Sequence, residues 1–283
     1  MMAVGHALSG WCTGLLVGAA TALPIFADSA GSSWNVVVVL TVSFGLAGSA
    51  LLPDIDHHGS TVTTSGGYAT WMIHRGVVHL HNSVCQLTWN PGEAMPGAHR
   101  GITHWWPTPL ISGFLVGFPC WLTWWAAWPV LSLLFALAIL GITVPEYRPS
   151  ERHTPGVEFA HRIAGFVPTI WLLKRIRRKV GRAGKIAVLA TSSAAAWGAL
   201  WYSPEIGRWL GVVVAAGMVL HILGDAPTLS RVPGWTLRGE LWLPRWLAFR
   251  AGGSFEVLAC WVPMSVFGVF AAPGVLPLAM SAW

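Results

Sequence analysis

Long apolar segments alternate with short polar ones along most of the chain. Seven of the apolar segments contain almost no charged residues, and several approach the ~20 residues that a helix needs to cross a bilayer. They span residues 7–26, 33–53, 109–127, 128–145, 186–202, 207–223 and 257–281. The pattern predicts an all-α, polytopic membrane protein with about seven transmembrane helices.

Two details of this arrangement follow from the same pattern. The segments 109–127 and 128–145 share a nearly continuous apolar stretch, and we place their boundary at Trp128–Pro129. Between the second and third spans, residues 67–89 place His74, Val78 and His81 along one face of a helix. This segment is predicted to lie in the membrane interface.

The composition supports a single integral-membrane domain covering residues 1–283. Charged residues make up only 10% of the chain, against ~25% in soluble domains. No Lys or Arg precedes the first apolar segment, so we expect a retained helix rather than a cleaved signal peptide. The four cysteines show no CxxC spacing and are interpreted as small hydrophobic residues.

The basic residues are distributed unevenly and predict the orientation. Ten of the 17 fall between Arg148 and Lys185, and most others lie between spans two and three or spans six and seven. Short loops rich in Lys and Arg stay in the cytoplasm. This rule places the N-terminus and the basic loop 147–185 in the cytoplasm. Because topology already accounts for the loop, we expect membrane lipids as partners and not nucleic acid.

This topology brings metal-capable side chains from four segments to the cytoplasmic face. Span one begins there, span two ends there at "DIDHH", span three begins after "HRGITH", and span six ends at "HILGDAPT". Carboxylates and imidazoles together suit Zn²⁺, Mn²⁺ or Mg²⁺. The candidate metal ligands are His6, Asp54, Asp56, His57, His104, His221 and Asp225.

Each motif also has a simpler explanation as interfacial polarity. A cap that ends a span needs one acid, however, and "DIDHH" supplies two acids and two histidines. His221 and Asp225 are spaced i,i+4 and therefore project from one helical face. If Thr103 caps the following helix, His104 lies in its first turn. An Arg100 guanidinium beside a metal would suit an anionic substrate such as a phosphate ester.

Two further features leave alternatives open. "HRGVVH" at residues 74–79 repeats the pattern of "HRGITH", so His74 and His79 could form a second metal pair, although polar residues on a surface helix are commoner. Glu256 precedes the last span and could face the substrate. We found no P-loop, GxGxxG, HExxH or GxSxG motif in the chain.

With these motifs in order, the chain resembles the bacterial inner-membrane family named after the YdjM protein. Its members are described as LexA-binding, inner-membrane-associated, metal-dependent hydrolases. The resemblance implies a divalent-metal site formed by the Asp and His residues above, and it suggests kinship to zinc-dependent phospholipase C and nuclease-like phosphodiesterases. The matching pieces are His6, "LLPDIDHH", "HRGITH", "HILGDAPT", and "LWLP" followed by "GGSFE".

We therefore expect a metal-dependent phosphoester hydrolase with its site at the cytoplasmic face. Zinc is the favoured ion, with manganese or magnesium as alternatives, and the ligands suffice for one or two ions. Arg100, Thr103 and Glu256 are the candidate catalytic residues. The alternative is a transporter or non-enzymatic metal-binding protein, which would place polar residues at mid-depth in several spans. Here the polar residues gather at one end.

Overall fold

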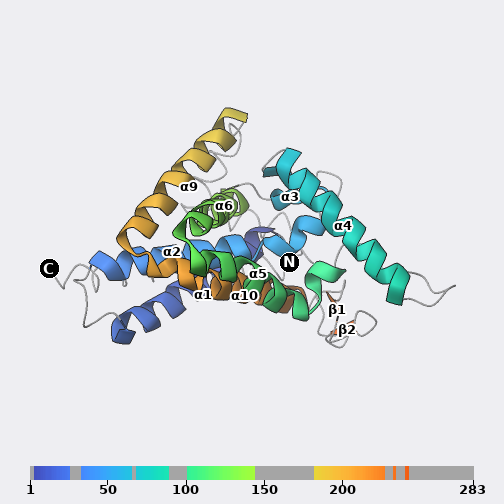
Figure 1. Cartoon of the computed structure of the whole chain (residues 1–283), viewed down its shortest axis with the longest axis horizontal. Coiled ribbons are helices and arrows are strands. Elements are labelled where there is room, and N and C mark those ends of the chain that lie inside the picture. The colour runs from blue at the N-terminus through green and yellow to red at the C-terminus, as the bar shows by residue number, and fades with distance from the viewer. Residues whose placement is uncertain are drawn as a thin grey trace, which may run out of the picture.

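The computed structural model describes residues 3–25, 33–65, 68–88, 101–143, 182–226, 232–233 and 240–241. These residues are almost entirely helical (Figure 1), and two residue pairs, β1 (Val232–Pro233) and β2 (Glu240–Leu241), form a short antiparallel ladder. The α-helices are α1 (Ala3–Ile25), α2 (Ser33–Ser49), α3 (Thr61–Ser65), α4 (Tyr68–Thr88), α5 (Pro107–Leu122), α6 (Trp124–Thr143), α9 (Arg182–Tyr202) and α10 (Glu205–Asp225), with 3₁₀ turns η1 (Leu52–Asp56) and η2 (Ile102–His104).

Helix α2 lies at the centre of the bundle. It packs against α1, α6 and α10, while α5 covers another side of α10 and α9 packs on α6. The core between these helices is aliphatic, and its fully buried members include Leu131, Leu134 and Leu210. Close packing of these side chains against one another holds the bundle together.

Three helical segments of the described residues are long and apolar enough to cross a membrane. They are Val37–Asp56, Trp124–Gly141 and Glu205–Asp225, and α5 is a shorter apolar helix. The all-helical class is thus confirmed. The predicted segments 7–26 and 186–202 form α1 and α9, but 257–281 lies outside the described residues. The total of seven spans therefore stays a prediction.

The break between α5 and α6 falls at Thr123, so the predicted boundary at Trp128–Pro129 is wrong. Thr123 is extended (φ −144°, ψ 134°), and its hydroxyl accepts a hydrogen bond from the Ala126 amide at 3.3 Å. A threonine that satisfies an amide of the first turn is a helix N-cap. Pro129 lies inside α6 instead, early in a helix whose start is already set by this cap.

Small residues allow α5 and α10 to approach closely. A methyl group added at Gly113 would lie 2.7 Å from the carbonyl oxygen of Gly211 and 2.8 Å from the Ala215 methyl carbon. Both distances are below van der Waals contact. Close packing through small residues is a common means of helix association in membranes.

The Gly113→Ala protein is expected to unfold more easily than the wild type. Overpacking of a tight contact costs about 1–3 kcal/mol, so its thermal midpoint in detergent should fall. The matched control is Gly198→Ala, because a methyl group there meets nothing within 4 Å and alanine favours the helix by roughly 0.5–1 kcal/mol. Equal midpoints for the two variants would contradict the proposed tight contact.

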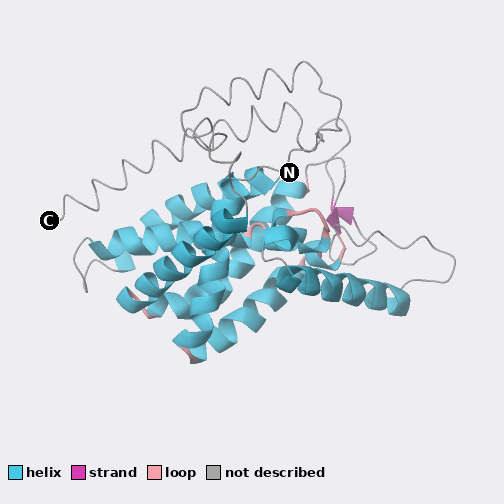
Figure 2. Ribbon diagram, turned by 90° about the horizontal axis from the view of Figure 1, so that it is seen from above, coloured by secondary structure: helices cyan, strands magenta, loops and turns pink. Residues whose placement is uncertain are grey.

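Helix α4 extends away from the bundle in both views (Figures 1 and 2) and contacts η1 and α3. Its bounds agree closely with the segment 67–89 that was predicted to be helical. Its sequence mixes polar and apolar residues throughout, and it lies beside the turns that carry the polar residues described next.

Candidate metal centre

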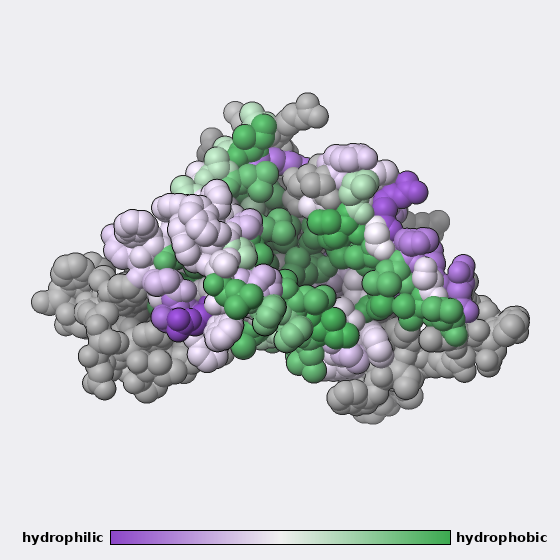
Figure 3. All heavy atoms as spheres, viewed as in Figure 1, coloured by the Kyte–Doolittle hydropathy of each residue, from purple (hydrophilic) through white to green (hydrophobic). Residues whose placement is uncertain are grey.

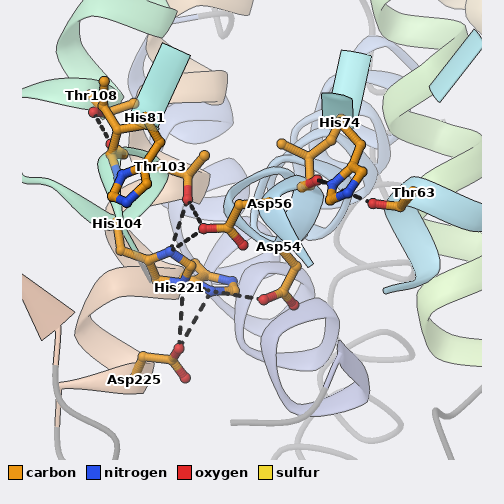
Figure 4. A network of polar contacts seen from close by, with 12 residues as sticks. Asp54, Asp56, Thr63, His74, His81, Thr103, His104, Thr108, His221 and Asp225 are labelled. Atoms are coloured by element: carbon orange, nitrogen blue, oxygen red, sulfur yellow. Dashed lines mark hydrogen bonds and ion pairs between the residues drawn. The ribbon is translucent and has the colours of Figure 1, made fainter. Parts of the chain in front are cut away.

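Side chains from η1, η2 and α10 come together in Figure 4, and His6 of α1 stacks on His221 beside them. Most are almost completely shielded from solvent, although they are polar or charged. The aliphatic residues Ala7, Leu51 and Leu137 pack beside them. We call this group the polar centre; it consists of His6, Asp54, Asp56, Thr103, His104, His221 and Asp225.

The last turn of α10 supplies two members of the polar centre. The i,i+4 spacing places Nε2 of His221 3.6 Å from Oδ2 of Asp225, as the sequence spacing predicts. The other ring nitrogen, Nδ1, lies 2.6 Å from the carbonyl oxygen of Ala50. A carbonyl only accepts hydrogen bonds, so Nδ1 carries the proton and Nε2 of a neutral His221 presents a lone pair.

A short chain of contacts orients His104 in the same way. The Thr103 hydroxyl donates to Oδ2 of Asp56. Nδ1 of His104 lies 3.0 Å from the Thr103 oxygen and 3.5 Å from the same Asp56 oxygen. Both oxygens act as acceptors toward the ring, so Nδ1 carries a proton, and Nε2 of a neutral His104 presents a lone pair.

Thr103 therefore has a different structural role from the one expected. It was predicted to cap the helix after it, but the residue at the N-cap of α5 is Trp106, and no side-chain hydrogen bond caps this helix. Thr103 lies inside η2 and is buried. Its hydroxyl donates a hydrogen bond to the Asp56 carboxylate, which is 47 positions away in the sequence.

The two lone pairs point at each other. Nε2 of His104 and Nε2 of His221 are 2.9 Å apart, and Oδ2 of Asp225 lies 3.5 Å and 3.6 Å from them. Two facing lone pairs repel unless a proton or a cation lies between them. A triangle of this size contains a point about 2 Å from each atom, which is the usual zinc–nitrogen and zinc–oxygen distance.

His6 and Asp54 extend the group on the other side of His221. The His6 ring stacks on the His221 ring with centroids 3.6 Å apart, and its Nε2 lies 3.2 Å from Oδ1 of Asp225. Within the described residues, neither buried nitrogen of His6 makes a well-oriented hydrogen bond. Oδ1 of Asp54 is 3.6 Å from Nε2 of His221. Buried nitrogens without hydrogen bonds fit a site that holds a cation.

Two overlapping triads have donor atoms that all lie within 4.8 Å of one another. One is His6, Asp54 and His221, and the other is His104, His221 and Asp225. His221 belongs to both triads, so the donor set suits one ion with extra ligands or two adjacent ions. Mixed nitrogen and carboxylate donors of this kind suit zinc, with manganese as a harder alternative.

Solvent reaches the polar centre at Asp54. Its side chain is 15% exposed, whereas the side chains of His221 and Asp225 are 0% and 2% exposed. Asp54 is thus the acid of the polar centre that water contacts most readily, and it lies in η1, where the candidate span Val37–Asp56 ends.

The electrostatics of the polar centre attract positive charge to His104. Burial lowers the pKa of His104, but hydrogen bonds to Asp225 and Asp56 and the charges of both carboxylates outweigh this effect. The net result raises the pKa of His104 to about 9. The surrounding carboxylates thus stabilise a positive charge between the two imidazole rings.

The structure brings most of the predicted ligands together but gives two of them other surroundings. Asp56 lies on the Nδ1 side of His104, away from its Nε2, and His57 follows η1 with its ring centroid 5.1 Å from that of His58. Among the described residues, neither belongs to the two triads. Arg100 and Glu256 lie outside the described residues.

The repeated motif on α4 is also separate from the triads. His79 is exposed, and Nδ1 of His74 donates to the Ile55 carbonyl oxygen at 2.6 Å. His81 is buried and lies against η2. Sequence reasoning placed His81 on the helix face beside His74 but gave it no role; its seven-residue spacing from His74 was the available signal.

Comparison with known proteins identifies one similar family. Residues 1–144 match the family described as YdjM inner membrane protein. This region contains α1, η1 and η2, and therefore five of the seven residues of the polar centre. No curated protein and no solved structure gives a significant match.

Proposed function

The chain belongs to the YdjM inner membrane protein family, and from this premise and the geometry of the polar centre we propose that it is a membrane-embedded, metal-dependent hydrolase. The proposed site faces the cytoplasm, and the proposed substrate is a phosphoester of a lipid or a lipid-linked group. One observation carries the proposal: two imidazole Nε2 atoms lie 2.9 Å apart, and a buried carboxylate oxygen lies 3.5 Å from one of them.

The residues of the polar centre would divide into ligands and supports. His104, His221 and Asp225 would hold the ion, with Asp54 and His6 available to a second ion or to a wider shell. The Ala50 carbonyl fixes the tautomer of His221, and the Thr103–Asp56 pair fixes that of His104. Supports of this kind typically change metal affinity by about 10–100-fold.

Hydrolysis is the reaction class that suits this donor set. A divalent ion in such a site supplies Lewis acidity toward water and toward a phosphoryl oxygen. The Asp54 carboxylate is more exposed than that of Asp225 and would accept the proton that the attacking water loses. The buried Asp225 and His6 would keep the rest of the site dry, which strengthens each electrostatic contact inside it.

The position of the site supports a substrate at the membrane surface. The polar centre lies where the candidate spans Val37–Asp56 and Glu205–Asp225 both end. The opposite end of α10 carries the exposed pair Glu205 and Arg208 and shares none of the residues of the centre. A site at the end of its spans meets lipid headgroups directly, so a lipid phosphoester would reach Asp54 without leaving the bilayer.

Elemental analysis of the detergent-purified chain tests the metal, and a substrate panel tests the reaction. We expect at least one zinc or manganese ion per chain, and turnover of a phosphodiester or phosphomonoester lipid in mixed micelles. A chelator should stop turnover, and added metal should restore it. Absence of metal would contradict the centre, whereas bound metal without turnover of any phosphoester would favour a non-enzymatic metal-binding protein.

A further inference from the structure

Helix α4 has three distinct faces. One face is buried against the protein and includes Thr70, His81 and Cys85. A second face carries large exposed apolar side chains seven residues apart, which share one side of a helix. The third face is exposed; its first turn carries Tyr68, Trp71 and Met72, and the rest of it is polar. The apolar flank consists of Ile73, Leu80 and Leu87, and the polar flank of Arg75, His79, Asn82 and Gln86.

The two exposed flanks point in different directions. Figure 3 shows hydrophilic residues along the outer edge of α4 and hydrophobic ones on the side toward α5. Leu80 is 54% exposed and Leu87 86% exposed. Exposing such large apolar side chains to water is unfavourable, whereas contact with lipid is not. Arg75 lies 5.0 Å from the centre of the Trp71 ring, a pairing that suits the headgroup region.

The first contact of α4 with the polar centre goes through His74. Its Nδ1 donates to the carbonyl oxygen of Ile55 at 2.6 Å, and Ile55 stands between the two aspartates of η1. The Thr63 hydroxyl lies 3.2 Å from the same oxygen and 2.9 Å from the His57 carbonyl oxygen, and its single proton can go to either. The hydrogen bond from His74 restrains the Ile55 peptide, and with it the directions of Asp54 and Asp56.

The second contact goes through His81, seven residues further along the same face. The Ile102 amide donates to Nδ1 of His81 at 3.2 Å. Ile102 is the first residue of η2, directly before Thr103 and His104. One straight helix therefore makes a hydrogen bond to each of the two turns that carry ligands from outside α1 and α10.

We propose that α4 rests on the surface of the lipid bilayer through its apolar flank. Through His74 and His81 it also fixes the positions of η1 and η2 relative to each other. The occupant of the flank is the acyl–headgroup boundary of the membrane that the chain itself spans. The connection supports this choice, because α4 follows the end of the span Val37–Asp56 after only a short helix. The coupling to metal binding rests on the proposed function, but the docking of α4 does not.

The surface contact is tested by nitroxide labels on the full chain in lipid nanodiscs. Labels are placed by Leu80→Cys and Leu87→Cys on the apolar flank, with the adjacent His79→Cys and Gln86→Cys as matched controls. We expect the first pair to collide with oxygen dissolved in lipid and the second pair with a water-soluble nickel chelate. Equal exposure of all four labels to the chelate would overturn the proposal, and shielding of the first pair from both reagents would replace lipid with a protein partner.

The coupling is tested by amide hydrogen exchange, which needs neither metal nor activity. The double change Leu80→Glu, Leu87→Glu places charge on the lipid flank, and His79→Glu, Gln86→Glu places the same charge on the water flank. We expect exchange at residues 54–57 and 101–105 to accelerate about tenfold in the first variant only, because loosened contacts open locally. Unchanged exchange in both variants would overturn the coupling.

Two substitutions of His81 distinguish a positioning role through its hydrogen bond from a role in packing alone. His81→Ala removes the acceptor of the Ile102 amide, whereas His81→Gln retains an acceptor oxygen. We expect faster exchange at residues 101–105 in the alanine variant and recovery in the glutamine variant, with zinc affinity following the same order. If the wild type binds no zinc, the proposed function fails while the exchange and label results still decide the role of α4.

Discussion

The His221→Asn protein is expected to bind no stoichiometric zinc and to hydrolyse no phosphoester above background. Asparagine retains an amide that donates to the Ala50 carbonyl, as Nδ1 does now at 2.6 Å, but it has no atom at the place of Nε2. Nε2 of His221 belongs to both triads. Since supporting residues alone change metal affinity by ~10–100-fold, loss of this shared ligand should exceed that range.

The measurement is zinc content after dialysis, with the melting temperature of the metal-free protein as a check on folding. His79→Asn is the matched control, because His79 is exposed on α4 and lies outside the triads. It should retain full zinc content. If His221→Asn folds and binds zinc as the wild type does, the assignment of both triads is wrong.

The convergence of the polar centre could be predicted because it depends on topology and on local spacing. Counting spans and basic loops is enough to place His6, "DIDHH", "HRGITH" and "HILGDAPT" at one membrane face. The i,i+4 rule is enough to align His221 with Asp225. Neither argument needs any knowledge of how the helices pack, so both can be made from the residues alone.

The orientation of each ring could not be predicted, because it depends on partners that are distant in sequence. The Ala50 carbonyl is 171 positions from His221, and Asp56 is 47 positions from Thr103. Only the packed bundle brings these groups together. The same reason explains why the sequence suggested a capping role for Thr103, since a cap is the local use of a threonine at that place.

The two similar motifs show how backbone context changes the use of a histidine. "HRGVVH" lies within α4, and the helix continues through Gly76 without interruption from Tyr68 to Thr88. "HRGITH" ends in the 3₁₀ turn η2 after Gly101 (φ −88°, ψ −122°). The turn directs His104 into the polar centre, whereas the helix directs His74 to a backbone carbonyl.

The Asp225→Asn protein is expected to lose at least ~100-fold in zinc affinity, although its fold should survive. The carboxylate of Asp225 lies 3.2 Å from His6, 3.5 Å from His104 and 3.6 Å from His221. An amide has the same shape but no charge. A buried divalent cation requires neutralising charge, and among the triad residues His104, His221 and Asp225 only Asp225 supplies it.

The readout is the rise in melting temperature that zinc produces. A ligand at 100 times its Kd stabilises the protein that binds it by about 2.7 kcal/mol, and a ligand at its Kd by only about 0.4 kcal/mol, so at the same zinc concentration the wild type should show a clear shift and Asp225→Asn a small one or none. The matched control is Glu205→Gln at the other end of α10, where the side chain is 55% exposed and paired with Arg208. It removes one negative charge from the same helix and should leave the zinc shift intact. An undiminished shift in Asp225→Asn would mean that Asp225 serves only as an ion-pair partner of His6, and that the ion is held on the Asp54 side of His221.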